Sequence, residues 1–461
     1  MIKTRFAPSP TGDPHIGNIR SALFSYLFAK KNGGEFLLRI EDTDKKRHVE
    51  KSVQTIKDAL KWLKILPKNI NSPIVQSKRL EIYKKAAMKL LEEDKAYVCD
   101  CSQKRLKEIR EIQKAKGLPP GYDGHCRNRK LEFKSGCVIR MKVPKTGKIV
   151  VNDLIRGQVE FDLSTIDDQI ILKSDGFPTY HLAHVVDDAE MGITHVIRAE
   201  EWLPSTPKHI LLNQMLGYKI PQYAHLPVIL GPNRGKLSKR DGATGIMEYK
   251  KLGYLPEALI NFMVLLGWNP KTNEEFFTLD ELEKKFDIKQ VNHAAAIFDI
   301  QKLNHFNRHY IQKKPASELI ALLDPKIVSK LRRQSLEKAV ELAQQRMTTL
   351  NDFGETISYL ISEPKIDHQK LIFKKSTAAN TKKALEIAAA TLKEITKWEK
   401  SEILTTLQKI VSQNELSNGD VFWSVRFALS GLEKSPPPEE IAEVLGKEET
   451  IKRIKIALNK L

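Results

Sequence analysis

Cysteines and long apolar runs are scarce in this sequence, and acidic residues are outnumbered by basic ones. Four cysteines in 461 residues argue against the disulfide framework of a small secreted scaffold. The longest apolar stretch, 259–268, is interrupted by Asn261 and Gly267 and is too short to span a bilayer, which favours a core helix. The N-terminus has no apolar signal region. We therefore expect a cytoplasmic protein without a membrane partner.

Basic residues outnumber acidic ones, which leaves a strong positive charge. Lys and Arg number 76 against 57 Asp and Glu, which gives a formal net charge of +19. This excess indicates a polyanionic partner such as nucleic acid, although composition alone fits a basic, non-binding surface equally well. The chain is long enough for about two to four domains, and 41% apolar residues is ordinary for a globular protein.

The first 44 residues predict a strand, a loop and a helix. An apolar strand at 3–6 ends in a Pro/Gly turn, after which we expect Asp13 as the N-cap and Pro14 as the first helical residue. The helix should end near Asn32. His15 then lies at a helix N-terminus, where backbone N–H groups favour an anion such as a nucleotide phosphate. A lone histidine at such a position is more often structural.

Strand and helix signals alternate along the first half of the chain. A strand at 36–40 and a helix at 53–63 complete a βαβ pattern, which implies a parallel sheet. The alternation returns over 169–198. Between these parts lies an apparent insertion, for which we expect a helix at 79–93 and strands at 138–143 and 149–151. Strand signals fade beyond residue 245, and we expect basic helices that include 336–342, 381–392, 441–445 and 447–460.

A second cluster of interest is Lys236-Leu-Ser-Lys239-Arg240, which follows a Gly/Pro-rich loop. Three cations within five residues form a positive clamp suited to charge that develops on a polyphosphate. Taken alone, a solvated basic loop is the more common explanation. Together with His15 the clamp resembles the two signature boxes of class I aminoacyl-tRNA synthetases, with His15-Ile-Gly17-Asn18 as the HIGH box and the clamp as the KMSKS box.

Other stretches narrow this resemblance to the bacterial glutamyl-tRNA synthetases. They are Arg5-Phe-Ala-Pro-Ser-Pro-Thr-Gly12, Arg39-Ile-Glu-Asp-Thr-Asp44, Lys173-Ser-Asp-Gly-Phe-Pro-Thr-Tyr180, Val186-Asp-Asp188 and Arg198-Ala-Glu-Glu-Trp202. The resemblance implies an α/β fold: a Rossmann-like catalytic domain (1–78 and 176–245), an inserted α+β domain that binds the tRNA acceptor end (79–175), a connecting helical domain (246–315) and a helical anticodon-binding region (316–461).

The resemblance also implies a reaction. Glutamate and ATP, with Mg²⁺, form glutamyl-adenylate and pyrophosphate, and the acyl group then moves to the terminal adenosine of tRNA-Glu. The implied catalytic residues are His15, Gly17, Asn18, Lys236, Ser238, Lys239 and Arg240. The implied ATP-binding residues are Gly12, His15, Gly17, Glu201, Trp202, Leu237 and Lys239. Without a side chain, Gly17 lets adenine lie against the helix backbone.

Substrate choice is expected to depend on charge, because glutamate and glutamine are nearly isosteric. By resemblance, Arg5, Arg198 and the Tyr180 hydroxyl hold the side-chain carboxylate, which suits the geometry of a guanidinium. Glutamine would present an amide N–H₂ to these donors, a mismatch that can give about 10⁴–10⁵ discrimination. Glu41 would take the α-ammonium. The remaining residues expected in this pocket are Ala7, Ser9 and His184.

Three of the cysteines resemble the zinc site of some family members. Cys99, Cys101 and Cys126 would supply thiolates, and Tyr122 or His125 the fourth ligand that a closed site requires. Asn128 stands where a histidine ligand is often found. A metal-free knuckle of buried thiols is the alternative. Cys137 is expected to lie in a strand as a small core residue.

The expected tRNA contacts are Asp44, Arg47 and Arg346, where Arg346 matches a position that reads the third anticodon base. Ordinary salt bridges or a surface arginine would also explain them. We expect a monomer. The rival functions are an enzyme that also, or instead, charges tRNA-Gln, a tRNA-modifying glutamyl-transferase, and a nucleic-acid-binding protein with an inactive catalytic fold. A dinucleotide oxidoreductase is disfavoured, because no G-x-G-x-x-G follows the first strand.

Overall fold

The computed structural model describes the chain except for residues 45–48, 50, 236 and 238–244. It divides into two compact units, which are residues 1–251 with 256–306 and residues 252–255 with 307–461. Within the described ranges, no helix has the length and apolar character needed to cross a bilayer. The finer division into four domains stays a prediction.

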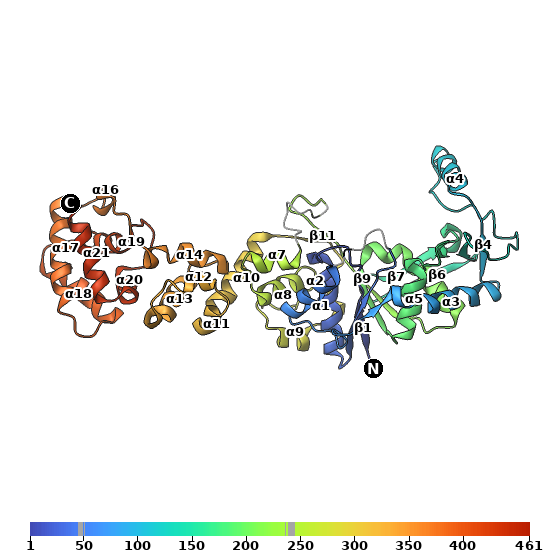
Figure 1. Cartoon of the computed structure of the whole chain (residues 1–461), viewed down its shortest axis with the longest axis horizontal. Helices are drawn as coiled ribbons and strands as arrows, with labels where there is room; N and C mark the ends of the chain where they lie inside the picture. The colour runs from blue at the N-terminus through green and yellow to red at the C-terminus, as the bar shows by residue number, and fades with distance from the viewer. Residues whose placement is uncertain (45–48, 50, 236, 238–244) are drawn as a thin grey trace. The chain divides into compact units, whose positions relative to one another are not determined.

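A parallel sheet organises the first unit (Figure 1). Strands β1 (Lys3–Phe6), β2 (Glu35–Ile40) and β3 (Ile74–Val75) pair in parallel in the order β1-β2-β3. On the other side of β1 lies β9 (His195–Ala199), which is parallel to β10 (Gln222–Leu226). Thr194 N–H donates to the Lys3 carbonyl oxygen at 3.0 Å, so β9 continues the sheet beyond β1. The βαβ prediction is therefore confirmed.

Helices cover both faces of this sheet. Helix α1 (Ile16–Lys31) packs against α8 (Pro256–Leu265) and α9 (Leu279–Lys285). The other helices of this part are α2 (Ser52–Trp62), α5 (Tyr180–Glu190), α6 (Thr206–Leu216) and α7 (Ile246–Lys251). Helix α6 ends at Gly217, which adopts the left-handed conformation at φ 74°.

The predicted start of the first helix is wrong by two residues. The N-cap is His15, whose imidazole accepts the Gly17 N–H at 3.1 Å, and Asp13 lies outside the helix. The reason is tertiary pairing: the Pro14 carbonyl accepts the Ile246 N–H, and His15 bridges Gly245. The Asp13 carboxylate instead accepts the backbone N–H of Met247, in the first turn of α7. The predicted helix end near Asn32 is confirmed.

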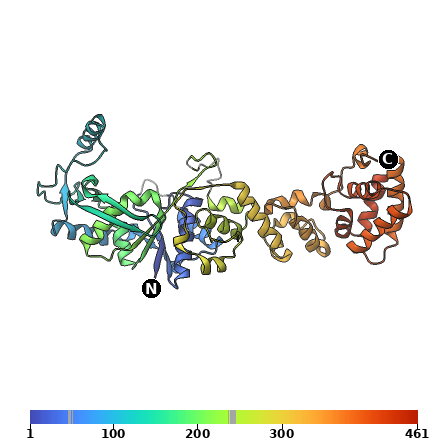
Figure 2. The same cartoon turned by 180° about the vertical axis from the view of Figure 1, so that it is seen from behind.

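The segment 79–175 forms two small antiparallel arrangements. Strands β4 (Ala96–Cys99), β5 (Val138–Met141) and β8 (Ile170–Leu172) make one sheet, and β6 (Lys148–Asp153) and β7 (Gly157–Asp162) make a hairpin (Figure 2). At Asp153, β6 pairs in parallel with Tyr223 of β10, so the hairpin extends the main sheet. The helices are α3 (Leu80–Glu92) and α4 (Gln103–Ala115). The predicted helix at 79–93 and the two predicted strands are confirmed.

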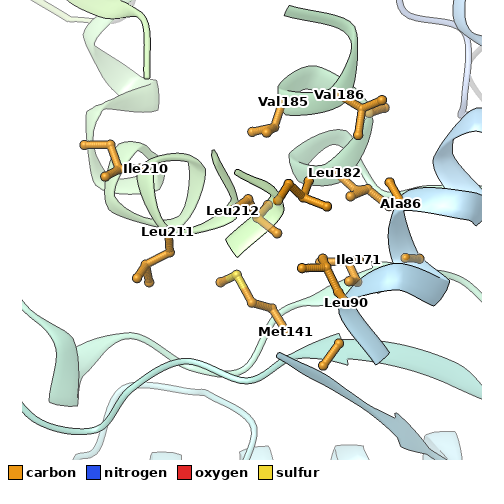
Figure 3. Packing of buried hydrophobic residues seen from close by; sticks show 14 of the residues in the cluster. Ala86, Leu90, Met141, Ile171, Leu182, Val185, Val186, Ile210, Leu211 and Leu212 are labelled. Atoms are coloured by element: carbon orange, nitrogen blue, oxygen red, sulfur yellow. The ribbon is translucent and has the colours of Figure 1, made fainter. Parts of the chain in front are cut away.

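The apolar core of this segment is continuous with that of the sheet (Figure 3). Buried side chains from α3 and from β5 and β8 point toward those of α5 and α6. Figure 3 labels Ala86, Leu90, Met141, Ile171, Leu182, Val185, Val186, Ile210, Leu211 and Leu212. Protein interiors are closely packed and transmit displacements. We therefore expect a change of side-chain packing in the segment 79–175 to shift α5, whose first residue, Tyr180, belongs to the candidate site.

The described part of the second unit is helical, as the fading strand signals predicted. Its main core is formed by α17, α18, α19, α20 and α21. The remaining short strands, β11 (Ile229–Leu230) and β12 (Ala296–Ile297), pair in the first unit. The helices from residue 300 on are α10 (Ile300–Lys313), α11 (Ala316–Ile320), α12 (Pro325–Val328), α13 (Leu336–Gln344), α14 (Phe353–Thr356), α15 (Ser358–Ile361), α16 (His368–Leu371), α17 (Ala378–Lys393), α18 (Lys400–Gln413), α19 (Ser424–Ser430), α20 (Pro438–Leu445) and α21 (Lys447–Leu458).

Candidate active site

The predicted pocket residues gather at the carboxyl edge of the parallel sheet, where ligands of open α/β sheets usually bind. Arg5 lies near the end of β1, Glu41 directly follows β2, and Arg198 is close to the end of β9. Tyr180 opens α5 beside them. The Pro8 carbonyl accepts the Glu41 N–H at 3.0 Å, which places the loop that carries Ala7 and Ser9 against Glu41.

Arg39 is the centre of a buried network of opposite charges. Its guanidinium donates to Glu41 Oε1 at 3.0 Å and to Asp188 Oδ1 at 2.5 Å, and lies 3.7 Å from Asp187 Oδ2. Arg5 Nε donates to the same Asp188 at 3.1 Å. Burial by itself would raise the pKa of Asp188, but the two guanidiniums lower it overall. Asp188 therefore stays charged and holds both arginines in place.

Glu41 has one carboxylate oxygen engaged in this network. Both hydrogen bonds from Arg39 arrive at Oε1, and among the described residues no donor is bonded to Oε2. Burial raises the pKa of Glu41, with Arg39 and Arg5 acting in the opposite direction. A cation bound at Oε2 would favour the ionised form.

Arg198 has a different environment. Its guanidinium donates to the Tyr180 hydroxyl at 3.2 Å, to His225 Nε2 at 3.1 Å and to Thr206 Oγ1 at 2.9 Å, and lies 3.3 Å from His209 Nδ1. Among the described residues it forms no ion pair with a carboxylate, although only 6% of it is exposed. Arg198 is thus a buried cation whose direct partners are all uncharged side chains and a carbonyl.

The histidines beside Arg198 are neutral. Burial lowers the pKa of His181 to about 4, and it lowers the pKa values of His184 and His209 well below the usual range, with Arg198 adding to the effect. Tyr180 stacks on His184 at 5.3 Å between ring centroids, and it contacts Trp202 at 4.3 Å. These aromatic rings surround the Arg198 guanidinium but carry no negative charge.

The predicted phosphate site lies at the start of α1. His15 and Asn18 are exposed there, and Gly12 precedes them with φ 139°. A Cβ on Gly17 would lie 3.1 Å from the His15 imidazole, so glycine keeps room for this ring beside the helix backbone. Leu237 is half-buried. Lys236, Ser238, Lys239 and Arg240 lie outside the described residues.

The three predicted cysteine ligands come together. The sulfur atoms of Cys99, Cys101 and Cys126 all lie within 4.8 Å of one another, with Cys101 Sγ and Cys126 Sγ 3.5 Å apart. The Tyr122 hydroxyl is 3.5 Å from both Cys99 Sγ and Cys101 Sγ. Tetrahedral zinc with bonds of about 2.3 Å to sulfur fits sulfurs at this spacing. This donor set therefore suits a soft divalent metal.

The other cysteine prediction is wrong in its location. Cys137 stands directly before β5 and is only half-buried, because a turn at residues 135–136 delays the strand. His125, the alternative fourth ligand, is exposed and does not belong to the cluster.

Asp44, Glu201 and Arg346 lie at the surface of their units. Asp44 and Glu201 are exposed, and Arg47 lies outside the described residues. Arg346, in the second unit, is exposed in the turn after α13, where its guanidinium donates to the Leu342 carbonyl at 3.1 Å. The contacts of Asp44, Arg47 and Arg346 with tRNA therefore stay predictions.

Sequence reasoning missed the residues that hold the pocket. Arg39 and Asp188 stand inside quoted motifs, yet nothing in their spacing shows that they meet. His209 and His225 lie on α6 and β10, outside the quoted motifs. One signal in the sequence points to such supporting residues. Arg198 stands in the apolar strand His195-Val-Ile-Arg198, and a buried cation needs hydrogen-bond acceptors from elsewhere in the chain.

Comparisons with known proteins show the family to which this chain is similar. Residues 1–305 match the family model of the catalytic domain of class I tRNA synthetases (E and Q), and residues 318–458 match an anticodon binding domain. A glutamate–tRNA ligase of Dehalococcoides mccartyi is 44% identical over 100% of this chain and 98% of its own length. Glutamate–tRNA ligase 2 of Thermoanaerobacter pseudethanolicus is 45% identical over 99% of this chain and 98% of its own length.

Solved structures give the same result. A glutamate tRNA ligase from Elizabethkingia meningosepticum, crystallised in complex with its amino acid, superposes with a TM-score of 0.91. It is 35% identical in sequence, and the match covers 99% of both chains.

Proposed function

The chain belongs to the class I tRNA synthetases of the E and Q type, and we propose that it activates glutamate with ATP and transfers it to tRNA. Its full-length relatives are glutamate–tRNA ligases. In this reaction the α-carboxylate attacks the α-phosphorus of ATP and pyrophosphate leaves. A terminal ribose hydroxyl of the tRNA then attacks the acyl carbon, and AMP leaves.

The observation that carries the choice of glutamate is the uncompensated charge of Arg198. Burying a cation is costly unless an anion pairs with it. The γ-carboxylate of glutamate supplies that anion, with the Tyr180 hydroxyl as a neighbouring donor. Arg5 would contribute the part of its guanidinium that Asp188 does not engage. Glutamine is neutral and would leave Arg198 unpaired, so the pocket favours the acid over the amide.

The opposite end of the substrate meets a negative group. The Glu41 carboxylate is held by Arg39 through Oε1, and we propose that Oε2 accepts the α-ammonium of glutamate. Ala7, Ser9 and His184 would line the same space. A cation at one end and an anion at the other select an amino acid of fixed length and polarity.

ATP is proposed to bind at the start of α1. His15 would contact its phosphates, and the Gly17 backbone would face adenine. Gly12, Asn18, Glu201, Trp202 and Leu237 would complete this site. Lys236, Ser238, Lys239 and Arg240 would stabilise charge on the departing pyrophosphate, together with the Mg²⁺ that the family uses. Loss of one such pre-aligned donor costs about 2.7–4 kcal/mol in other enzymes.

We also propose a structural zinc ion held by Cys99, Cys101, Cys126 and Tyr122. The hydroxyl of Tyr122 takes the place of the histidine that this chain lacks at Asn128, and it already accepts the Cys126 N–H at 2.8 Å. Bound zinc would fix the loop 122–126 against β4.

The tRNA is proposed to be tRNA-Glu, contacted by Asp44, Arg47 and Arg346. An enzyme that also charges tRNA-Gln uses the same amino acid pocket, so the pocket does not separate these two functions. The net charge of +19 suits either tRNA.

One experiment tests this function. ATP–pyrophosphate exchange is measured with glutamate, with and without tRNA, together with charging of tRNA-Glu and tRNA-Gln. We expect glutamate-dependent charging of tRNA-Glu and a large loss of it in Lys239→Ala. If neither tRNA-Glu nor tRNA-Gln is charged, the proposal is overturned.

A further inference from the structure

Arg198 is held by a chain of buried polar groups that begins in the segment 79–175. Its Nε donates to His225 Nε2 at 3.1 Å, and His225 Nδ1 lies 2.6 Å from Asp153 Oδ2. The exposed fractions of Arg198, His225 and Asp153 are 6%, 0% and 5%. These three residues come from β9, β10 and the end of β6, which are adjacent strands of one sheet.

The contacts fix which ring nitrogen of His225 carries the proton. Asp153 is ionised, because the bond from His225 and those from backbone N–H groups outweigh the effect of burial and lower its pKa. The carboxylate therefore accepts the proton on Nδ1, and Nε2 is left as an acceptor for the Nε–H of Arg198. Burial lowers the pKa of His225, which keeps the ring neutral.

We propose that Asp153 and His225 are positioning residues for glutamate selection, which act by orienting the Arg198 guanidinium. This inference rests on the proposed function, since it assigns Arg198 to the substrate carboxylate. With Nε held by His225 and one Nη group donating to the buried Thr206 hydroxyl, which itself lies 3.2 Å from His225 Nε2, the other Nη group is directed toward Tyr180 in the proposed pocket. The segment 79–175, expected to bind the tRNA acceptor end, thereby contributes a residue to the support of the amino acid pocket.

Asp153→Asn tests the chain through its geometry. Asp153 Oδ1 accepts backbone N–H groups from Ile155 at 3.0 Å, Arg156 at 2.8 Å and His225 at 3.2 Å. An asparagine oxygen must occupy that position, so its N–H₂ faces His225 Nδ1 and drives the ring proton to Nε2. Two N–H groups then face each other at Arg198. A wrong histidine tautomer of this kind is strongly disabling in another enzyme.

Glutamate charging kinetics give the readout. For Asp153→Asn we expect the KM for glutamate to rise about tenfold or more, while the KM for ATP and kcat at saturating glutamate stay within about twofold. The preference for glutamate over glutamine, measured as a ratio of kcat/KM, should fall. A disturbance of folding alone would lower activity toward both amino acids alike and would leave this ratio unchanged.

The control is Asp168→Asn. Asp168 is a carboxylate of the same segment, 1% exposed and bonded to Tyr97 and Arg127. In the part of the chain that the structure describes, Asp168 has no bond to the proposed pocket residues, so the variant should lose thermal stability without a change in the KM for glutamate. If Asp153→Asn does not fold, two variants of His225 replace it. His225→Gln keeps an acceptor for Arg198 and His225→Phe removes it, so the KM for glutamate should rise less in His225→Gln than in His225→Phe.

Two results would be decisive against the inference. An unchanged KM for glutamate in a folded Asp153→Asn enzyme would overturn it, and so would equal kinetics of His225→Gln and His225→Phe. Failure of the unmodified protein to charge tRNA would instead overturn the proposed function, so the two outcomes are distinct.

Discussion

The substrate pocket and the cysteine cluster of the first unit are both small polar sites, but their groups are partnered differently. Around the pocket, Arg39 and Arg5 are already paired with carboxylates, and Arg198 alone has only uncharged direct partners. In the cluster, three sulfurs lie against one another and against Tyr122. The arrangement around Arg198 therefore lacks one negative charge, whereas the cysteine cluster, by our proposal, is completed by a metal ion. Substitutions at the two sites should have correspondingly different consequences.

The largest effect is expected for Arg5→Ala. Loss of this guanidinium removes a donor to the substrate and leaves Asp188 with one fewer cation. We expect kcat/KM for glutamate in tRNA charging to fall about 10³-fold or more. Lys3→Ala on the same strand, whose side chain is 31% exposed, is the matched control and should charge normally. Equal activity of the two variants would show that the pocket is elsewhere.

Arg39→Gln should chiefly affect folding. The substitution removes the common partner of Glu41 and Asp188, and leaving buried charges without their partner costs about 3–5 kcal/mol. Urea denaturation measures the free energy of unfolding. Lys148→Gln, which removes an exposed pair with Glu160, should leave it unchanged. A small effect of Arg39→Gln would mean that water already solvates the network.

Acid should weaken the pocket through its histidines. The folded pKa of His181 is about 4, below the 6.5 of the free side chain, so the unfolded chain binds a proton that the folded chain excludes. Its contribution to stability is present above pH 6.5 and is lost as pH falls from there toward 4. Urea denaturation across this range should show a shallower decline for His181→Gln than for the control His368→Asn. Parallel curves would contradict this account.

The cysteine cluster should be sensitive to removal of its metal ion. We expect one zinc per chain by elemental analysis, none in Cys126→Ser, and one in Cys137→Ser, because Cys137 lies outside the cluster. Tyr122→Phe should bind zinc more weakly than the unmodified chain. Chelation should cost less charging activity than Arg5→Ala. A metal-free protein that resists chelators would favour a knuckle of thiols.

The smallest effect is expected in the second unit. Arg346→Ala removes an exposed guanidinium of the second unit. We expect kcat/KM for tRNA-Glu to fall about tenfold, with the KM for glutamate unchanged, as for the loss of a single base contact. A change in the KM for glutamate would contradict a role confined to the anticodon.

The sequence predicted helices and strands better than it predicted which residues contact one another in the fold. Local signals located β1, β2 and the end of α1, because apolar runs and Gly33-Gly34 act over a few residues. They misplaced the N-cap, since the partner of Pro14 is Ile246, far along the chain. The resemblance named Arg5, Glu41 and Arg198, but their supports come from distant strands and helices. Such partners depend on tertiary contacts that spacing does not encode.

We propose that the buried charge of Arg198, which has no carboxylate partner among the described residues, selects the substrate. The most direct test compares kcat/KM for glutamate and glutamine in charging of tRNA-Glu by the unmodified protein. We expect the unmodified protein to prefer glutamate by about 10⁴ or more, and this preference should fall sharply in Arg198→Leu. Comparable use of the two amino acids by the unmodified protein would contradict it.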